Sequence, residues 1–282
     1  MQKLKQISNN IFYLPSYQET DRPILAAIVG EERTLLIDAG NSSSHAKLFQ
    51  DQLEEHNISG DWLVLTHWHW DHIFGMSEVQ LPIIAHSMTH DKIKELQELS
   101  WEDRFLDQRV KEGIEIPFCA DAIKKELGSQ RDIFLPNPDL IFETRIEVNL
   151  GGRTCVIEHV GGDHSHDSSI IYIPEDKVLF LGDCLYANLY AKEWNYTVEK
   201  MLNLIHRIEK YDAETFFLSH HDAPLTQIEF RSFLTLLKCT ADLTKKYGGG
   251  REVIISEMAK RFQRSLNELD LEIIGYFVNG FK

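Results

Sequence analysis

The chain has 282 residues, of which 43% are hydrophobic and 26% are charged, and its net charge is −15. This length supports one large domain or two small ones, with a sizeable core. The acidic balance excludes a phosphate-binding surface of clustered Lys and Arg, so nucleic acid is a poor candidate partner. It also offers little attraction to anionic membranes.

The N-terminus, from Met1 to Gln6, carries no apolar core of a secretory signal, and no window approaches the roughly 18 apolar residues of a membrane span. The four cysteines are widely scattered and predict reduced thiols rather than a disulfide framework: Cys119, Cys155, Cys184 and Cys239. We therefore expect a cytoplasmic protein whose partner is a small-molecule substrate, with no nucleic acid, no membrane and the option of a homodimer.

The first third of the chain predicts mostly strands. The pattern indicates an edge strand over 4–14, a hairpin of strands over 24–29 and 34–37, an amphipathic helix after the N-capping residues 41–44, and short strands over 61–66 and 81–85. From 86 to about 135 apolar residues recur at helical spacing instead, and Pro117 interrupts them before a second short helix over 120–127. This segment predicts a helical insertion, which either packs against a sheet or forms a lid over a site.

Strands return in the second half. The pattern predicts strands over 140–148, 153–160, 169–173, 177–181 and 215–218, a helix over 197–210, and a C-terminal helical extension over 226–282 that Gly248 to Gly250 interrupt. Two batches of strands, each followed by helices, predict an α/β fold of two packed sheets flanked by helices, as one domain over 1–282.

The most informative stretch is Thr66-His67-Trp68-His69-Trp70-Asp71-His72, directly after the apolar run 62–65. In extended backbone, His67 and His69 point the same way, whereas Asp71 and His72 follow a turn and can face a second point. Imidazole and carboxylate ligands suit zinc, iron or manganese better than calcium or magnesium. The alternative is a surface loop that happens to be rich in His and Trp.

Three later stretches also place His or Asp after an apolar strand. They are His159-Val160-Gly161-Gly162-Asp163-His164-Ser165-His166-Asp167, Leu181-Gly182-Asp183, and Leu218-Ser219-His220-His221-Asp222. Each alone is more often structural than functional. Four such strand ends together indicate one common site.

Taken in order, these stretches resemble the motifs of the metallo-β-lactamase superfamily, over about residues 10–230. The match begins with Asp38 in Leu36-Ile37-Asp38-Ala39-Gly40 and continues with the His-x-His-x-Asp-His stretch. The resemblance implies an αββα sandwich of two mixed β-sheets flanked by helices. It also implies two divalent metal ions, zinc first, with iron or manganese as alternatives.

The resemblance assigns the ligands residue by residue: His67, His69 and His164 for one metal, Asp71, His72 and His221 for the other, and Asp183 between them. Asp38 would orient a ligand by hydrogen bonding. Two departures are present. Asp163 stands where the family has Gly, and the late motif offers two adjacent histidines, of which we choose His221 and keep His220 as the alternate.

The implied reaction is hydrolysis by a hydroxide shared by two metals, with Asp71 orienting it or moving its proton. Asp183 and the absence of a signal argue against secreted β-lactamases, and the acidic charge argues against nucleases. The remaining branch resembles glyoxalase II and the lactonases, which cleave an ester, thioester or lactone. The spacing of Tyr186 after Asp183 resembles acyl-homoserine lactonases, where Tyr assists at the substrate carbonyl; Tyr186 could equally be packing.

Other readings stay open. They are a persulfide dioxygenase-like oxygenase with one iron held by two His and one Asp, a phosphodiesterase, and a non-catalytic binding protein that keeps the fold. For the insertion we expect four apolar side chains to overhang the metals and set substrate size, with the C-terminal helices as an optional second contributor: Trp101, Phe105, Leu106 and Phe118.

Overall fold

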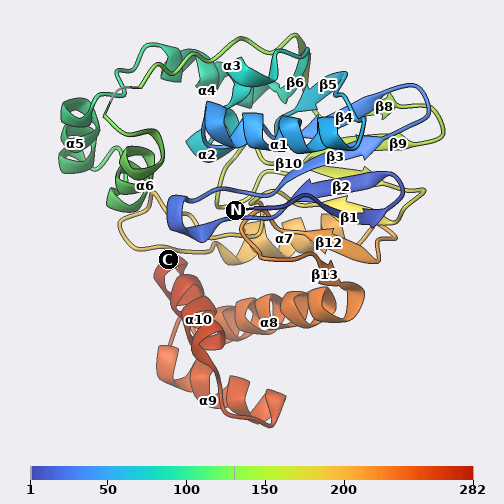
Figure 1. The fold of residues 1–282 in the computed structure, drawn as a ribbon. Coiled ribbons are helices and arrows are strands. Elements are labelled where there is room, and N and C mark those ends of the chain that lie inside the picture. Colours follow the sequence, from blue (N-terminus) through green and yellow to red (C-terminus); the bar gives the residue numbers. More distant parts are fainter. Residues whose placement is uncertain (1, 130, 282) are drawn as a thin grey trace.

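The computed structural model describes residues 2–129 and 131–281. Two sheets lie face to face and helices cover both outer faces, so the predicted αββα sandwich is confirmed (Figure 1). No helix within these residues combines the length and the apolar character that a membrane span requires. The four cysteines are free, as expected.

The first sheet has seven strands, which follow one another across the sheet in chain order. They are β1 (Lys5–Ser8), β2 (Ile11–Leu14), β3 (Leu25–Val29), β4 (Thr34–Ile37), β5 (Trp62–Val64), β6 (Ile83–His86) and β7 (Leu140–Phe142). Strands β1 to β4 are antiparallel, and β4 to β7 are parallel. The edge strand predicted over 4–14 is therefore a hairpin, which turns at Asn9 and Asn10.

The second sheet has the order β13-β12-β11-β10-β9-β8. Its strands are β8 (Arg145–Asn149), β9 (Thr154–His159), β10 (Ser169–Ile173), β11 (Val178–Phe180), β12 (Thr215–Phe217) and β13 (Leu225–Thr226). The single strand predicted over 140–148 is wrong. Its first part pairs with β6 and its second part with β9, so the chain changes sheets within two residues. An apolar pattern cannot reveal such a change, because both parts are strands.

Helices α1 to α6 and a short 3-10 helix accompany the first sheet. They are η1 (Gln18–Thr20), α1 (Ser43–Glu55), α2 (Trp70–Ile73), α3 (Met76–Val79), α4 (Ser87–Gln97), α5 (Asp103–Glu112) and α6 (Pro117–Leu127). The Ser42 side chain caps α1 by accepting from the His45 amide, as the N-capping pattern predicts. Helices α4 to α6 form the predicted insertion, and α6 begins at Pro117, a favourable first helical position.

Helices α7 to α10 pack on the second sheet and on each other. They are α7 (Val198–Ile208), α8 (Gln227–Lys246), α9 (Arg251–Phe262) and α10 (Glu268–Gly280). Capping boxes begin α8 and α10, and Gly248 and Gly249 adopt positive φ between α8 and α9. In Figure 1, α8 to α10 project from the sandwich as an arm.

The core has three layers. One lies between the sheets and includes Ile28, Leu35, Ile171 and Phe217. The other two lie between each sheet and its own helices. Because both faces of the sheets are buried, polar side chains gather where the strands end, and this edge carries the site.

Candidate metal centre and cavity

The candidate ligands come from both sheets. His67 and His69 leave the end of β5, and the short helix α2 then carries Asp71 and His72. His164, Asp183 and His220 follow β9, β11 and β12 of the second sheet. These loops meet at one edge of the sandwich, which rigid strands fix in place.

Three imidazoles form the first group: His67, His69 and His164. All three side chains are buried, and one ring nitrogen from each lies within 4.8 Å of the others. His69 Nδ1 and His164 Nε2 are 2.9 Å apart. The structure thus brings together the three residues that the resemblance assigns to the first metal.

The second group consists of Asp71, His72, Asp183 and His220. His220 Nε2 lies 3.2 Å from an oxygen of Asp71 and 3.2 Å from an oxygen of Asp183. His72 Nε2 lies 3.0 Å and 3.4 Å from the same two oxygens. Four buried or nearly buried side chains therefore face one point.

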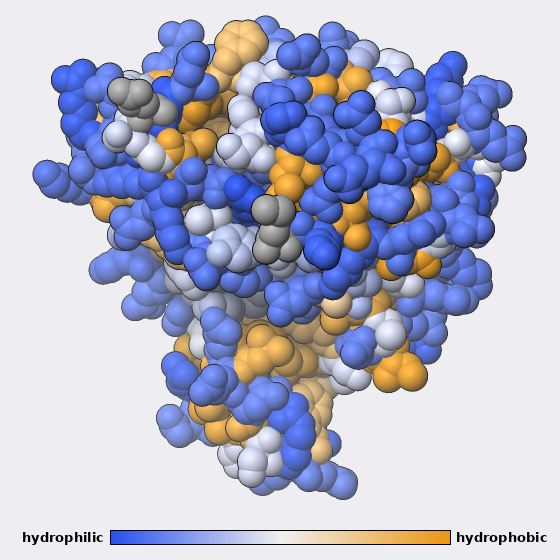
Figure 2. All heavy atoms as spheres, in the orientation of Figure 1, coloured by the Kyte–Doolittle hydropathy of each residue, from blue (hydrophilic) through white to orange (hydrophobic). Residues whose placement is uncertain are grey.

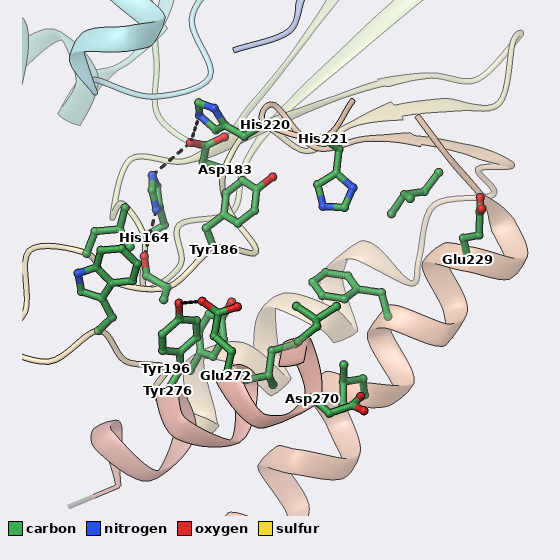
Figure 3. A pocket seen from close by; sticks show the side chains of 18 of the residues that line it. His164, Asp183, Tyr186, Tyr196, His220, His221, Glu229, Asp270, Glu272 and Tyr276 are labelled. Atoms are coloured by element: carbon green, nitrogen blue, oxygen red, sulfur yellow. Dashed lines mark hydrogen bonds and ion pairs between the residues drawn. The ribbon is translucent and has the colours of Figure 1, made fainter. Parts of the chain in front are cut away.

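The choice of His221 is corrected by one residue, because His220 occupies the place expected for it. The chain turns directly after β12, so the alternation of extended backbone no longer decides which side chain points inward. His221 is half-buried in the wall of the adjoining cavity, and its carbonyl accepts from the Ser16 hydroxyl. Figure 3 shows the two rings pointing to different places.

Asp183 lies between the two groups. Its Oδ2 is 3.3 Å from His164 Nε2 and 3.2 Å from His220 Nε2 (Figure 3). The same oxygen lies 3.9 Å from His67 Nε2 and 3.4 Å from His72 Nε2. Gly182 makes this placement feasible, since it adopts φ +53 and a Cβ there would lie 2.9 Å from the Cβ of Thr66. The Gly-Asp pair of the sequence thus has a steric cause.

The two groups differ in their electrostatics. Burial, followed by repulsion from neighbouring imidazoles, lowers the pKa of His67 and His69 well below the usual value. Burial acts in the same direction on His72 and His220, but the carboxylates around them outweigh it and raise both pKa values well above normal. The second group therefore attracts positive charge, whereas His67 and His69 of the first group are kept neutral.

The donor set fits divalent cations. Neutral imidazole and carboxylate are the ligand types that zinc, iron and manganese take in proteins. Two buried ligand atoms meet no hydrogen-bond partner among the described residues: His67 Nε2 and Asp183 Oδ1. Buried polar atoms are normally paired, so these atoms fit a role as metal ligands.

Two further carboxylates contact the Nδ1 atoms of candidate ligand imidazoles. Asp38 Oδ2 lies 2.7 Å from His72 Nδ1, and its Oδ1 accepts from the Thr66 amide at 2.8 Å. This contact fits the orienting role expected for Asp38. Asp21 Oδ1 lies 3.4 Å from His220 Nδ1, and burial with the nearby Asp71 raises the pKa of Asp21 to about 6. Sequence analysis missed Asp21, because it follows no strand and belongs to no motif.

Asp163, the departure from the family pattern, supports the fold of the same loop. Its carboxylate accepts from the Thr197 amide at 2.6 Å, where α7 begins. The loop that presents His164 is thereby tied to a helix end. An Asp at this position therefore has a structural use that a Gly would not have.

A cavity of about 1250 Å³ opens onto the cluster. Tyr186 lies in its wall, with its ring centroid 6.0 Å from those of His164 and His220, and its hydroxyl makes no hydrogen bond within the described chain. Burial and the charge of Asp183 raise the pKa of this phenol well above normal, so it stays protonated.

The insertion contributes less to this cavity than expected. Of its four apolar side chains, Phe118 lines the cavity. Trp101 and Leu106 are buried in the core between the helices and the first sheet, and Phe105 is absent from the lining. The expectation that Trp101, Phe105 and Leu106 overhang the metals is therefore wrong, and the helical periodicity of Trp101 and Leu106 reflects packing.

The sequence matches the model of the metallo-beta-lactamase superfamily over residues 20–220. The chain therefore belongs to the metallo-β-lactamase superfamily. Its members include hydrolases, and its fold and His/Asp cluster agree with the ones found here. Among curated proteins no match was found.

Solved structures support the same fold. The metallo-beta-lactamase from Pontibacter korlensis shares 22% identity at a TM-score of 0.60, over 83% of this chain and 98% of that chain. The stereoselective inverting sec-alkylsulfatase Pisa1 from Pseudomonas sp. shares 16% sequence identity at a TM-score of 0.66, and the match covers 97% of this chain and 47% of the sulfatase chain. DIM-1 metallo-beta-lactamase shares 14% sequence identity at a TM-score of 0.56, and the match covers 83% of this chain and 95% of that chain. The present chain spans about half the length of the alkylsulfatase.

Proposed function

We propose that this protein is a hydrolase that uses two divalent cations, zinc or alternatively iron or manganese, to cleave a small ester, thioester or lactone. The observation that carries this proposal is the pair of ligand groups that share Asp183. His67, His69 and His164 would hold one cation, and Asp71, His72 and His220 the other. Divalent cations there would supply Lewis acidity and would lower the pKa of water from about 15.7 toward 7.

The surrounding residues support a division of roles. The Asp71 carboxylate, which faces His72 and His220, would orient the nucleophile or accept its proton. Tyr186, protonated and facing the cavity, would donate a hydrogen bond to the carbonyl oxygen of the substrate. Asp38 and Asp21 would keep His72 and His220 oriented.

A second candidate is hydrolysis of an alkyl sulfate ester. The specific observation is that the match to the sec-alkylsulfatase extends over 97% of this chain, so that it includes the C-terminal helices. The metallo-beta-lactamases match over 83%. Because the identity is 16%, this likeness concerns the fold, and the substrate has to be decided by assay.

The test combines metal analysis with a substrate panel on one batch of purified protein. We expect about two divalent cations per chain and turnover of an ester, thioester or lactone, both lost in His69→Ala. Turnover of sec-alkyl sulfates alone would favour the second candidate, and turnover of phosphodiesters alone would favour a phosphodiesterase. One iron per chain with oxygenation of a persulfide would overturn the hydrolase proposal, as would a fully metallated protein without any turnover.

A further inference from the structure

The cavity extends well beyond the metal cluster. At one end it is lined by the cluster residues His69, Asp71, Asp183 and His220, and at the other by side chains of α8, α9 and α10. Figure 3 shows the cluster residues on one side of this space and the C-terminal helices across from them. Pockets for small molecules usually measure about 300–1,000 Å³, so about 1250 Å³ exceeds what a small ester needs.

Eight of the side chains that line the far wall are apolar. They come from β13 and all three C-terminal helices: Leu225, Ile228, Phe233, Leu236, Phe262, Leu269, Ile273 and Tyr276. Ile228 and Leu269 are 79% and 48% exposed, although a folded chain gains nothing by leaving such groups in water. Figure 2 shows apolar surface gathered between the arm and the sandwich.

The carboxylates of this wall are engaged by residues close to them in the sequence. Asp270 accepts from Arg264 at 2.9 Å, and Glu229 accepts from the hydroxyl of its capping residue Thr226 at 2.7 Å. Glu272 accepts from the Tyr276 hydroxyl. Arg231 and Arg261 also line this wall, but most of the surface that the cavity residues expose is apolar, so apolar side chains are the main surface available to a ligand.

We propose that the substrate carries a long unbranched acyl or alkyl tail, which lies along the C-terminal helices while its scissile group lies at the cluster. This inference rests on the proposed function, since it names the substrate class of the same site. The occupant is a tail rather than a protein segment, because the cavity is continuous with the cluster. A protein seated there would cover Asp71 and Asp183, where the scissile group must lie.

The first test is kinetic. We measure kcat/KM for p-nitrophenyl esters from two to twelve carbons, below their micelle concentrations, and for matched thioesters. Each methylene that becomes buried should raise kcat/KM about fourfold. Leu269→Glu and Ile228→Glu should flatten this dependence and lower turnover of the twelve-carbon ester at least about tenfold, since a tail would then meet a carboxylate. Both positions are exposed, so the variants should fold.

Val253→Glu is the matched control. Val253 lies on α9, is 37% exposed and stands outside the cavity lining. It adds the same charge to the same arm, and it should keep the dependence on chain length of the unaltered protein. A flattening of equal size in Val253→Glu would show that charge on the arm, not contact with the tail, is responsible, and would overturn the proposal.

The second test measures binding without turnover. Dodecanoate and butyrate are titrated calorimetrically into the metal-loaded protein and its variants. We expect one dodecanoate per chain, at least about tenfold weaker binding in Leu269→Glu and unchanged binding in Val253→Glu. Light scattering records the oligomeric state of the same samples. A dimer that binds no dodecanoate would mean that a second copy fills the wall, and would overturn the inference.

The two proposals fail separately. Hydrolysis of short esters without any dependence on chain length, together with no dodecanoate binding, would overturn the tail inference and leave the proposed function in place. Dodecanoate binding that depends on Leu269, together with no turnover of any substrate in the panel, would keep the tail site and overturn the proposed reaction.

Discussion

The two ends of the cavity are built in different ways. At the polar end, buried His and Asp side chains leave rigid strands and contact one another at 2.7 to 3.9 Å. At the apolar end, helix faces leave side chains such as Ile228 and Leu269 partly exposed. The side chains of the polar end already face one another, whereas those of the apolar end leave space for an occupant. Under the two proposals, chemistry and substrate choice would depend on separate parts of the chain, which could be altered independently.

The sharpest test of the polar end compares two neighbouring histidines. His220→Ala removes a side chain that faces Asp71 and Asp183, so we expect loss of one cation per chain and a fall in kcat/KM of at least about 1,000-fold. His221→Ala removes part of the cavity wall, and kcat/KM should change less than about tenfold. Metal analysis and kinetics on both variants measure this. Equal losses, or the reverse order, would contradict the assignment of His220.

Trp101→Ala tests whether the insertion contributes to stability alone or also to substrate binding in the cavity. Trp101 packs edge-on against Phe74 at 4.7 Å between ring centroids, and the Arg109 guanidinium lies 4.8 Å above its ring. Truncating such a buried aromatic residue should cost about 3–5 kcal/mol of unfolding free energy, measured by denaturant titration. The KM of the folded fraction should stay unchanged. A raised KM with little loss of stability would show that Trp101 contacts the substrate and would contradict its assignment to the core.

Asp38 and Asp21, the two carboxylates that contact ligand imidazoles, should each affect metal affinity, and the shorter contact should have the larger effect. Asp38→Asn weakens a 2.7 Å contact with His72, and we expect metal affinity to fall about 10- to 100-fold. Asp21→Asn weakens a longer contact, 3.4 Å from His220, so its effect should be smaller. Competition with a chelator of known affinity ranks the two variants. Asp107→Asn, in an exposed ion pair with Lys124, should leave the affinity unchanged.

A buried histidine behind the polar end gives the smallest effect. Burial lowers the pKa of His45 well below 6.5, and neither ring nitrogen finds a hydrogen-bond partner in the described part of the chain. Below pH about 6.5 the unfolded chain takes up a proton at His45 that the folded chain does not, so stability falls as pH falls. His45→Leu removes this proton uptake.

We therefore expect His45→Leu to be as stable as the unaltered protein, or more so, at pH 7.5. Below pH about 6.5 the variant should gain up to about 1.4 kcal/mol per pH unit over the unaltered protein. Denaturant titrations at pH 7.5, 6.5 and 5.5 measure the difference. His206→Leu, at an exposed position of α7, serves as the control. A pH-independent difference in the His45 variant would mean that this imidazole is not kept neutral by the fold.

The sequence predicted the polar end well, because its residues lie in short motifs directly after apolar strands. His67, His69, His164 and Asp183 follow from local pattern and family resemblance, and the structure places them together. The late histidine was misplaced by one residue, because a tight turn after β12 breaks the alternation of the strand. Asp21 could not be found, since its contact with His220 joins residues 199 positions apart.

The residues of the apolar end could not be predicted, because amphipathic spacing shows which residues avoid water but not what covers them. Trp101 and Leu106 have the same kind of helical spacing as Phe233, yet Trp101 and Leu106 are buried in a core and Phe233 lies partly buried in the cavity wall. The same limit hid the change of sheet between β7 and β8, where both parts of the segment are strands.

The origin of the ligands in both sheets also has a thermodynamic consequence. Cations held at this edge would join the first sheet, through β5 and α2, to the second, through the loops after β9, β11 and β12. A cation that binds the folded chain but not the unfolded chain raises the free energy of unfolding by about 2.7 kcal/mol when the free cation concentration is 100 times the dissociation constant. The supply of metal would then affect the stability of the protein as well as its activity, and a chain without metal would be more open to proteolysis.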